Sequence, residues 1–466
     1  MDEKTNGQLL SEKLFLTKKH GAKLLTDDRI SEAFEFCDGY KAFLNKCKTE
    51  REAVSYALNT AVYNGFTPYD SSTVYKSGDK IYYVNRDKAI ILAIIGQESL
   101  ADGINILASH IDSPRIDLKQ VPLFEDSELA YFDTHYYGGI KKYQWTALPL
   151  ALHGVVVKKD GTNVFINVGE DADDPQFCVT DLLPHLAAEQ MKRTLSEAIK
   201  GEDLNILIGS LPFKDDKASN LVKLNIANIL YEKYDITEAD FLSAELTLVP
   251  ALRASDIGFD RSMIGAYGHD DRVCAYPSLM AMLDLDTPAK TAVCILTDKE
   301  EVGSDGNTGL NSCYFQNFIA ALADSQEGLN ARDVLPSSKC LSADVNAAHD
   351  PIYPDVLESK NEAYLNYGVV MTKYTGSRGK ADTSDASAEY VAKIRNLFDS
   401  RNIIWQTSEL GKVDMGGGGT VAKYLAKLDI DVVDIGVPVL SMHSPFEIVS
   451  KIDVFMAYRA FFEFLV

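Results

Sequence analysis

The chain has 466 residues, of which 46% are hydrophobic and 24% are charged, so it is long enough to form a large core and more than one domain. Its formal net charge of −22 repels phosphate backbones and anionic lipid, which argues against a nucleic-acid or membrane partner. Seven widely spaced cysteines without a CxxC pair indicate reduced thiols, and the N-terminus lacks the apolar stretch of a secretory signal. We therefore expect a soluble, cytoplasmic protein with no membrane-spanning segment.

The first 65 residues show helical periodicity. Apolar residues between Val54 and Val62 recur at the spacing of one helix face, and the pair Asn64-Gly65 suits a helix C-terminus. The pattern then changes to short apolar runs, which predict β-strands. These runs cover residues 81–84, 89–95 and 104–108.

The middle of the chain has a different pattern. Apolar runs at 155–157 and 164–166 flank the pair Asp160-Gly161, which favours a hairpin turn between two strands. We expect a helical stretch from about 180 to 200 and a further short strand at 244–249.

From about residue 265 onward, strand-like and helical runs alternate, which is typical of a largely parallel α/β sheet with helices on both faces. The candidate strands are 291–296, 339–342, 368–372 and 431–440. We predict an α/β fold with a mixed central sheet and flanking helices. Residues 1–119 and 256–466 would form one discontinuous catalytic domain, and residues 120–255 an inserted β-rich domain.

Four polar clusters each follow an apolar run, and they begin at His110, Asp298, Asp344 and His443. In open α/β sheets the functional crevice lies at the carboxyl ends of the strands, so we expect these clusters to converge on one rim. A glycine-containing acidic loop at 265–272 can reach the same place.

Together these clusters offer two imidazoles and several carboxylates, which are ligands that zinc binds at about 2.0–2.2 Å. Two zinc ions about 3.5–4 Å apart can share a carboxylate and a hydroxide. In the pair Glu300-Glu301, one glutamate can bind metal while its neighbour takes the proton from the attacking water. The same nitrogen and oxygen ligands also accept Mn²⁺ or Co²⁺.

Each of these residues also has an ordinary structural explanation. The acidic run at 298–301 alone is more often a solvated loop, Asp344 suits a helix N-cap, and His443 suits a turn. His110 is a stronger candidate because Asp112, two residues on, can orient its imidazole. The combination of five clusters of suitable residues favours a metal centre.

The order of these motifs resembles the aspartyl aminopeptidase family of co-catalytic zinc metallopeptidases, and the chain looks like a bacterial-type member. The matching segments span most of the chain. They are SHIDSPRIDLK (109–119), GHDDRVCAYPSL (268–279), DKEEVGSDGNTG (298–309), LSADVNAAHDP (341–351) and SMHSPFEI (441–448).

The resemblance implies a role for each matching residue. Two zinc ions per chain would be held by His110, Asp270, Glu301, Asp344 and His443. Asp270 would bridge the two ions, although Asp271 stays an alternative. The resemblance also makes Glu300 the general base and Asp112 the residue that orients His110.

The resemblance further implies peptide substrates and self-association into a homododecamer of dimers, with the inserted domain mediating assembly. Family members favour N-terminal Asp or Glu, and Lys373 lies where the family has a substrate-binding lysine. Four glycines at 416–419 form a distinctive loop that departs from the eukaryotic members. This departure keeps a broad-specificity zinc aminopeptidase open as an alternative. A second alternative, of a different class, is a catalytically silent assembly protein on the same fold.

Overall fold

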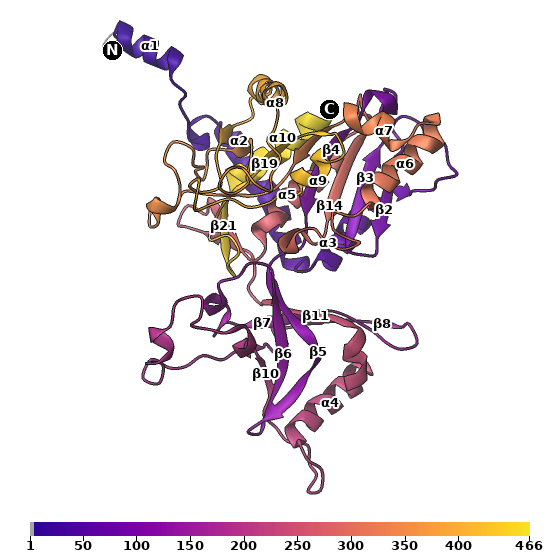
Figure 1. Cartoon of the computed structure of the whole chain (residues 1–466), viewed down its shortest axis with the longest axis vertical. Helices are drawn as coiled ribbons and strands as arrows, with labels where there is room; N and C mark the ends of the chain where they lie inside the picture. Colours follow the sequence, from indigo (N-terminus) through magenta and orange to yellow (C-terminus); the bar gives the residue numbers. More distant parts are fainter. Residues whose placement is uncertain (1–3) are drawn as a thin grey trace.

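The computed structural model describes residues 4–466, and Figure 1 shows an α/β body above a smaller β-rich part. The body contains both ends of the chain, whereas the magenta middle of the chain forms the β-rich part. This arrangement confirms the predicted mixed α/β fold. All seven cysteines are free thiols, as the sequence predicted.

A nine-stranded mixed sheet forms the centre of the body, in the order β1-β2-β3-β14-β4-β15-β19-β17-β18. Its strands are β1 (Thr67–Pro68), β2 (Lys80–Asn85), β3 (Ala89–Ile94), β4 (Asn105–His110), β14 (Ala292–Thr297), β15 (Lys339–Ser342), β17 (Val369–Thr372), β18 (Trp405–Thr407) and β19 (Asp431–Gly436). The central strands β14, β4, β15 and β19 run parallel, so their carboxyl ends lie at one edge. The run 292–296 of β14 is continuously apolar because helices cover both faces of the sheet.

Helices cover the two faces of this sheet and form two hydrophobic cores. One core contains side chains of α2 (Asp27–Lys46), α3 (Glu50–Tyr63), α5 (His269–Leu283), α8 (Ala388–Ser400) and α10 (Lys451–Leu465). The other contains side chains of α6 (Tyr314–Glu327), α7 (Ala331–Val334) and α9 (Ala422–Ala426). Successive residues of β3 alternate between the cores: Ile90 and Leu92 lie in the first, and Ile91 and Ala93 in the second.

A short N-terminal helix, α1 (Asn6–Leu14), projects away from the body in Figure 1, and none of its residues is buried. The predicted helical character of the first 65 residues is confirmed by α1, α2 and α3 within the described residues 4–65, and residues 1–3 lie outside them. Asn64 ends α3 and Gly65 follows with a φ of 87°, as the sequence indicated. No helix within residues 4–466 combines the length and the hydropathy that crossing a membrane requires.

The β-rich part is a seven-stranded antiparallel sheet in the order β8-β7-β11-β5-β6-β10-β9. Its strands are β5 (Arg115–Asp126), β6 (Leu129–Tyr137), β7 (Leu150–Val157), β8 (Asn163–Val168), β9 (Cys178–Val179), β10 (Ile206–Gly209) and β11 (Ala244–Pro250). The hairpin predicted around Asp160-Gly161 is confirmed by the pairing of β7 with β8. The sheet starts at Arg115 and ends at Pro250, so β5 begins before residue 120, where we expected the insertion to start.

The helix predicted at about 180–200 is wrong. This segment consists mainly of turns with one 3₁₀ turn at Gln190–Lys192, and the helix of this region is α4 (Leu221–Tyr234). Pro184 disfavours a continuous helix, and Leu186 and Met191 are 69% and 73% exposed. The apolar spacing therefore does not face a core that would stabilise a helix.

A five-stranded sheet lies beside the main sheet, in the order β12-β13-β21-β20-β16. Its strands are β12 (Ser255–Ile257), β13 (Met263–Ala266), β16 (Asn346–Ala347), β20 (Pro438–Leu440) and β21 (Glu447–Ser450). The single strand predicted at 431–440 is therefore two strands in two sheets, β19 and β20. This change of sheet carries the chain from the centre of the body toward the segment that contains His443.

Candidate metal centre

Five segments bring the predicted site residues to the carboxyl edge of the central sheet. His110 is the last residue of β4, and Asp344 follows β15. Glu300 and Glu301 lie in a 3₁₀ turn after β14. The other two segments are the start of α5, which contains Asp270, and the turn after β20, which contains His443.

Asp270 lies between the two histidines. Its Oδ1 is 3.2 Å from His110 Nε2, and its Oδ2 is 3.0 Å from His443 Nε2. Asp344 Oδ1 lies 3.9 Å from His110 Nε2, while Glu301 Oε2 lies 3.5 Å from His443 Nε2. The residues thus form two half-sites, each with one histidine and one further carboxylate, and Asp270 is shared between them.

Asp271 takes part in a different grouping. One possible metal-binding group consists of His110, Asp270 and Glu301, and another of His110, Asp271 and Asp344. Asp271 Oδ2 accepts a hydrogen bond from the backbone N–H of His110 at 3.4 Å, but only Asp270 contacts both imidazoles. The geometry therefore favours Asp270 over Asp271 as the shared carboxylate.

Carboxylates outnumber the cations of this centre. Burial raises the pKa of Glu300 to about 7 and raises the pKa of Glu301 and of Asp344 well above the ordinary value. Burial by itself would lower the pKa of His443, but its hydrogen bond to Asp270 outweighs this effect and raises that pKa to about 10.

Two buried carboxylate oxygens, Glu301 Oε1 and Asp271 Oδ1, have no hydrogen-bond partner among the described residues. Buried, unpaired negative charge is unfavourable without a cation, and nitrogen and oxygen ligands of this kind suit zinc. Divalent ions placed here would also lower the raised carboxyl pKa values, because a positive charge favours the ionised form. The donor set therefore fits a zinc centre.

Asp112 connects His110 to the turn that contains the two glutamates. Its carboxylate accepts hydrogen bonds from the backbone N–H groups of Glu300 and Glu301, both at 3.1 Å, and from the hydroxyl of Tyr137 at 2.7 Å. Asp112 Oδ1 also lies 3.3 Å from His110 Nδ1. This contact leaves His110 Nε2 directed at the centre and holds the Glu300 turn beside it.

The structure adds three positioning groups that the sequence did not reveal. Glu447 accepts hydrogen bonds from the backbone N–H of Asp270 at 3.1 Å and of His443 at 2.7 Å. The other two, Tyr137 and the carbonyl of Gly139, come from the end of β6 and the segment after it; Gly139 lies 2.8 Å from His443 Nδ1. Glu447 lies within the SMHSPFEI motif, but Tyr137 carries no sequence signal because its partners are distant in the chain.

The centre opens into a cavity of about 460 Å³, a volume within the usual range for ligand sites. The lining includes Asp270, Glu300, Glu301, Asp344 and His443 together with Gly417–Gly419. Lys373 is not among the lining residues. It is 41% exposed at its side chain and pairs with Asp385.

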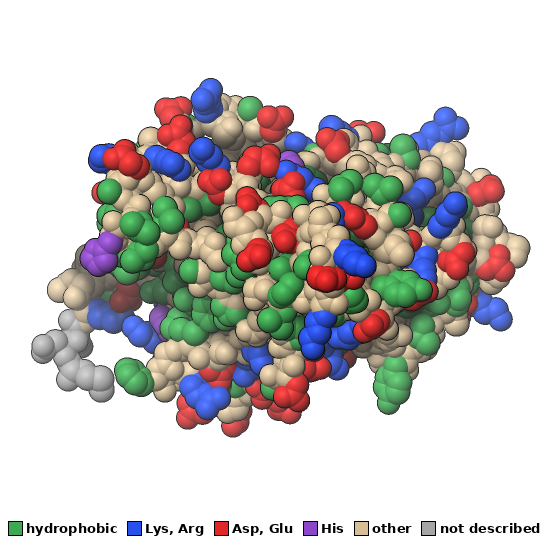
Figure 2. All heavy atoms as spheres, turned by 90° about the horizontal axis from the view of Figure 1, so that it is seen from below, with side chains coloured by type: hydrophobic (Ala, Val, Ile, Leu, Met, Phe, Trp, Pro, Cys, Tyr) green, Lys and Arg blue, Asp and Glu red, His purple; other side chains and the backbone are tan. Residues whose placement is uncertain are grey.

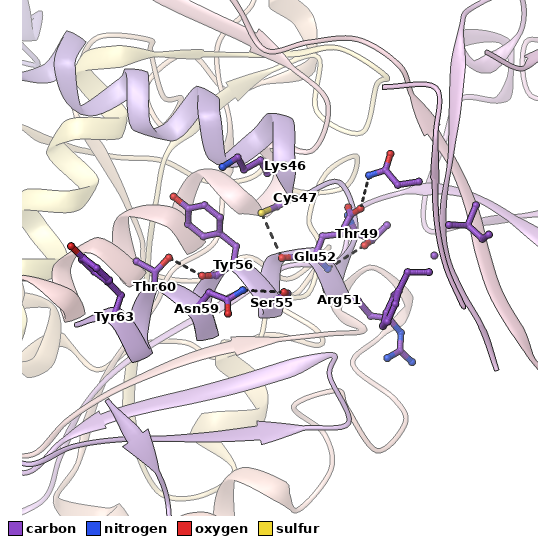
Figure 3. Close-up of a pocket in the computed structure, with 14 residues that line it drawn as sticks. Lys46, Cys47, Thr49, Arg51, Glu52, Ser55, Tyr56, Asn59, Thr60 and Tyr63 are labelled. Carbon is purple, nitrogen blue, oxygen red and sulfur yellow. Dashed lines mark hydrogen bonds between the residues drawn. The ribbon is translucent and has the colours of Figure 1, made fainter. Parts of the chain in front are cut away.

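A larger cavity, of about 730 Å³, lies between α3 and the β7–β8 hairpin (Figure 3). Tyr56, Asn59 and Tyr63 of α3 line one side of it, and Phe165 and Asn167 of β8 line the other. Neither of the metal-binding groups found within residues 4–466 lies there. The candidate metal ligands therefore identify the smaller of the two cavities as the candidate site.

The sequence and the fold are similar to those of known zinc metalloproteases. The family described as aminopeptidase I zinc metalloprotease (M18) matches residues 43–465. A Clostridium acetobutylicum protein named "Probable M18 family aminopeptidase 1" is 52% identical over 446 residues, which cover 94% of this chain and 96% of that protein. The crystal structure of an M18 family aminopeptidase from Thermotoga maritima has a TM-score of 0.91 and 43% identity, and the match covers 97% of this chain and 99% of that chain.

A more distant structure, of the S. cerevisiae mApe1 dodecamer, has a TM-score of 0.75 at 19% identity, covering 94% of this chain and 97% of that one. This similarity shows the fold alone.

Proposed function

Because the chain belongs to the M18 family of zinc aminopeptidases, we propose that it releases N-terminal residues from peptides by hydrolysis at a two-zinc centre, with a preference for Asp or Glu. The observation that carries this proposal is the position of Asp270 between His110 and His443. A carboxylate that has one oxygen near each imidazole is suited to bridging two metal ions.

His110 and Asp344 would hold one ion, His443 and Glu301 would hold the other, and Asp270 would contribute to both. Bound there, two zinc ions would supply Lewis-acid activation of a water molecule and of the substrate carbonyl. Mn²⁺ or Co²⁺ would suit the same ligands. Measuring the metal content of the purified protein tests the assignment, which predicts about two ions per chain.

Glu300 is the general base in this proposal. It lines the cavity and its Oε2 lies 3.9 Å from His110 Nε2, so it is next to the centre without being one of the assigned ligands. Its carboxylate takes the proton of the attacking water and then delivers it to the departing amine. Asp112 holds this arrangement through the backbone of Glu300 and through His110.

A preference for acidic N-terminal residues requires a cation near the substrate side chain. Family resemblance makes Lys373 the first candidate, but its ion pair with Asp385 would have to open before it could bind a substrate. Both partners are exposed, and such pairs contribute only about 0–1 kcal/mol, so opening is feasible. The second candidate function, a broad-specificity aminopeptidase, is favoured because Lys373 is not among the residues that line the cavity.

We further propose that the chain assembles as a homododecamer of dimers in the cytoplasm, through the β-rich part that we assign to residues 120–255. Apolar side chains are visible among the charged ones on the face shown in Figure 2, which is viewed from below Figure 1. In the β-rich part, Leu182, Leu186, Met191 and Leu195 are more than half exposed. Exposed apolar groups of this kind support a protein interface. Light scattering of the purified chain measures the oligomer size.

The function is tested by hydrolysis of Asp-, Glu- and Leu-terminal anilides with and without a chelator. We expect chelator-sensitive release that is fastest for the acidic anilides. If Leu is fastest, the broad-specificity alternative replaces the acidic preference. If zinc-loaded protein releases nothing, the chain is a silent assembly protein and the proposal is wrong.

A further inference from the structure

The cavity at the metal centre contains a single lysine. Lys423, in helix α9, is the only lysine or arginine among the described residues that line it. Its charged neighbours in the lining are the carboxylates and the histidine already assigned to the centre. Within residues 4–466, Lys423 takes part in no ion pair, and its Nζ lies 5.0 Å from the centroid of the Tyr424 ring.

The lysines that follow β17 are in a different situation. Lys373 and Lys380 both pair with the carboxylate of Asp385, and Lys380 Nζ also lies 3.7 Å from the ring centroid of Tyr374. Neither lysine lines the cavity of the metal centre. Both lysines are thus already engaged by one carboxylate, whereas Lys423 takes part in no ion pair within residues 4–466.

Neighbouring groups fix Lys423 near the reacting centre. The hydroxyl of Tyr424 donates a hydrogen bond of 2.6 Å to the carbonyl of Gly303, which joins α9 to the turn that contains Glu300. Lys423 Nζ also lies beside Gly419, because a Cβ added at Gly419 would be 3.8 Å from it. A glycine at this position leaves space next to the ammonium group.

We propose that Lys423 binds the side-chain carboxylate of the N-terminal substrate residue and so determines a preference for Asp and Glu. This inference rests on the proposed aminopeptidase function. The cavity carboxylates are assigned to metal binding and proton transfer, so a substrate carboxylate is the remaining partner for this cation. A net charge of −22 would otherwise repel acidic substrates, and a local cation offsets that repulsion.

The test compares Lys423→Met and Lys423→Glu with wild type, using zinc-loaded full-length protein and Asp-, Glu-, Leu- and Lys-terminal anilides. Lys427→Met is the matched control, because Lys427 lies 5.1 Å from the same Tyr424 ring but does not line the cavity. We expect Lys423→Met to lower kcat/KM for the acidic anilides about 10- to 100-fold, the scale of a lost charged hydrogen bond. Hydrolysis of the Leu anilide should change less than about threefold, and Lys423→Glu should favour the Lys anilide.

Several results would overturn the inference while leaving the aminopeptidase function intact. One is an equal loss for the acidic and Leu anilides in Lys423→Met. Another is loss of acidic preference in Lys373→Met alone. A third is a defect of Lys423→Met confined to the dipeptide Leu-Leu and absent from Leu-Leu-amide, which would assign Lys423 to a C-terminal carboxylate. Failure of all anilides in zinc-loaded wild type overturns both proposals.

A binding measurement gives an independent readout that needs no turnover. L-aspartate should raise the Tm of zinc-loaded wild type more than L-leucine does, and Lys423→Met should remove that difference. An unchanged difference in Lys423→Met would contradict the inference.

Discussion

Two buried clusters in this chain combine histidine with carboxylates, and they differ in whether the protein itself balances the charge. At the metal centre, His110 and His443 face several carboxylates, and no lysine or arginine pairs with those side chains among residues 4–466. Between the body and the β-rich part, His153 of β7 contacts Glu52 Oε1 at 2.8 Å and Glu170 Oε1 at 3.0 Å.

The second cluster is complete without a metal. Lys48 Nζ lies 2.8 Å from Glu170 Oε1 and also donates to the carbonyl of Pro250 at 2.6 Å. Glu52 accepts further hydrogen bonds from the backbone N–H groups of Lys48 and Thr49. Two cations thus balance two carboxylates, and this cluster joins α3 to the seven-stranded sheet beside the cavity of Figure 3.

The comparison shows that a buried histidine next to a carboxylate does not by itself identify a metal site. An excess of buried carboxylates over protein cations is the stronger indication, because those carboxylates must either take up protons or bind an external cation. Chelation and substitution of the general base should therefore lower the activity that depends on the metal centre. Substitutions in the second cluster should lower only the stability of the folded chain.

The largest expected effect is on turnover. Glu300→Gln should lower kcat by about 10²–10⁴-fold, the usual contribution of general acid–base catalysis, while the metal content stays unchanged. Glu35→Gln, at an exposed position of α2, is the control. Metal analysis and anilide hydrolysis on the same preparation measure both quantities. Turnover like that of wild type in Glu300→Gln would remove the general-base assignment.

Breaking the balanced cluster should affect stability instead. His153→Gln leaves Glu52 and Glu170 without their shared cation, which costs up to about 3–5 kcal/mol of unfolding free energy when such pairs are fully buried. The actual loss should be smaller because these side chains are 24% and 19% exposed. Urea unfolding measures the loss, and the metal content should equal that of wild type. Loss of bound metal in His153→Gln would contradict the distinction between the clusters.

Removing the metal should lower the stability of the folded chain through the metal centre alone, and not through the cluster around His153. Zinc at about 100 times its Kd should stabilise the folded chain by about 2.7 kcal/mol for each occupied site relative to the chelated protein. Thermal unfolding with and without a chelator measures this difference. The same difference should appear in His153→Gln, because the clusters share no residue; its disappearance there would show that they are coupled.

A smaller effect is expected from substituting Tyr137, the residue of the β-rich part that contacts Asp112 beside the metal centre. Tyr137→Phe removes one hydrogen bond to Asp112, and loss of such a supporting contact lowers metal affinity or activity about 10- to 100-fold. We expect the lower end, because two backbone N–H groups still hold Asp112. Tyr136→Phe is the control on the same strand. Equal activities of the two variants would exclude a positioning role for Tyr137.

The smallest effect is a pH dependence of the balanced cluster. Burial would lower the pKa of His153, but hydrogen bonds to Glu170 and Glu52 raise it; burial would raise the pKa of both glutamates, but their hydrogen bonds to His153 help to lower it. The histidine contribution is complete below about pH 6.5 and is lost as the pH rises through its folded pKa. The glutamate contributions are present above about pH 4.3 and are lost as the pH falls through their folded pKa values.

The stability difference between wild type and His153→Gln should therefore be largest between about pH 4.3 and 6.5. Unfolding curves across the pH range measure it. A difference that grows steadily above pH 8 would have the wrong sign.

Much of the fold could be predicted because its elements carry local signals. The strands β4, β14 and β15 are apolar runs that end in polar clusters, and the β7–β8 hairpin has an Asp-Gly turn. The helix predicted at 180–200 from apolar spacing is wrong because that spacing faces no core and because Pro184 disfavours a continuous helix. The position of β5 was also hidden, since it continues past the expected boundary without a turn signal.

The sequence by itself predicted the residue types of the candidate metal centre and placed His110, Asp344 and the Glu300-Glu301 pair after strands, because parallel strands place their carboxyl ends along one edge. Only the tertiary structure decided which carboxylate is shared, since Asp270 and Asp271 are adjacent in the chain but only Asp270 contacts both histidines. It also decided which lysine lines the cavity, because Lys373 and Lys423 are equally charged and differ only in their neighbours. Charge balance is a property of side chains that meet in space, and it cannot be obtained from their order in the chain.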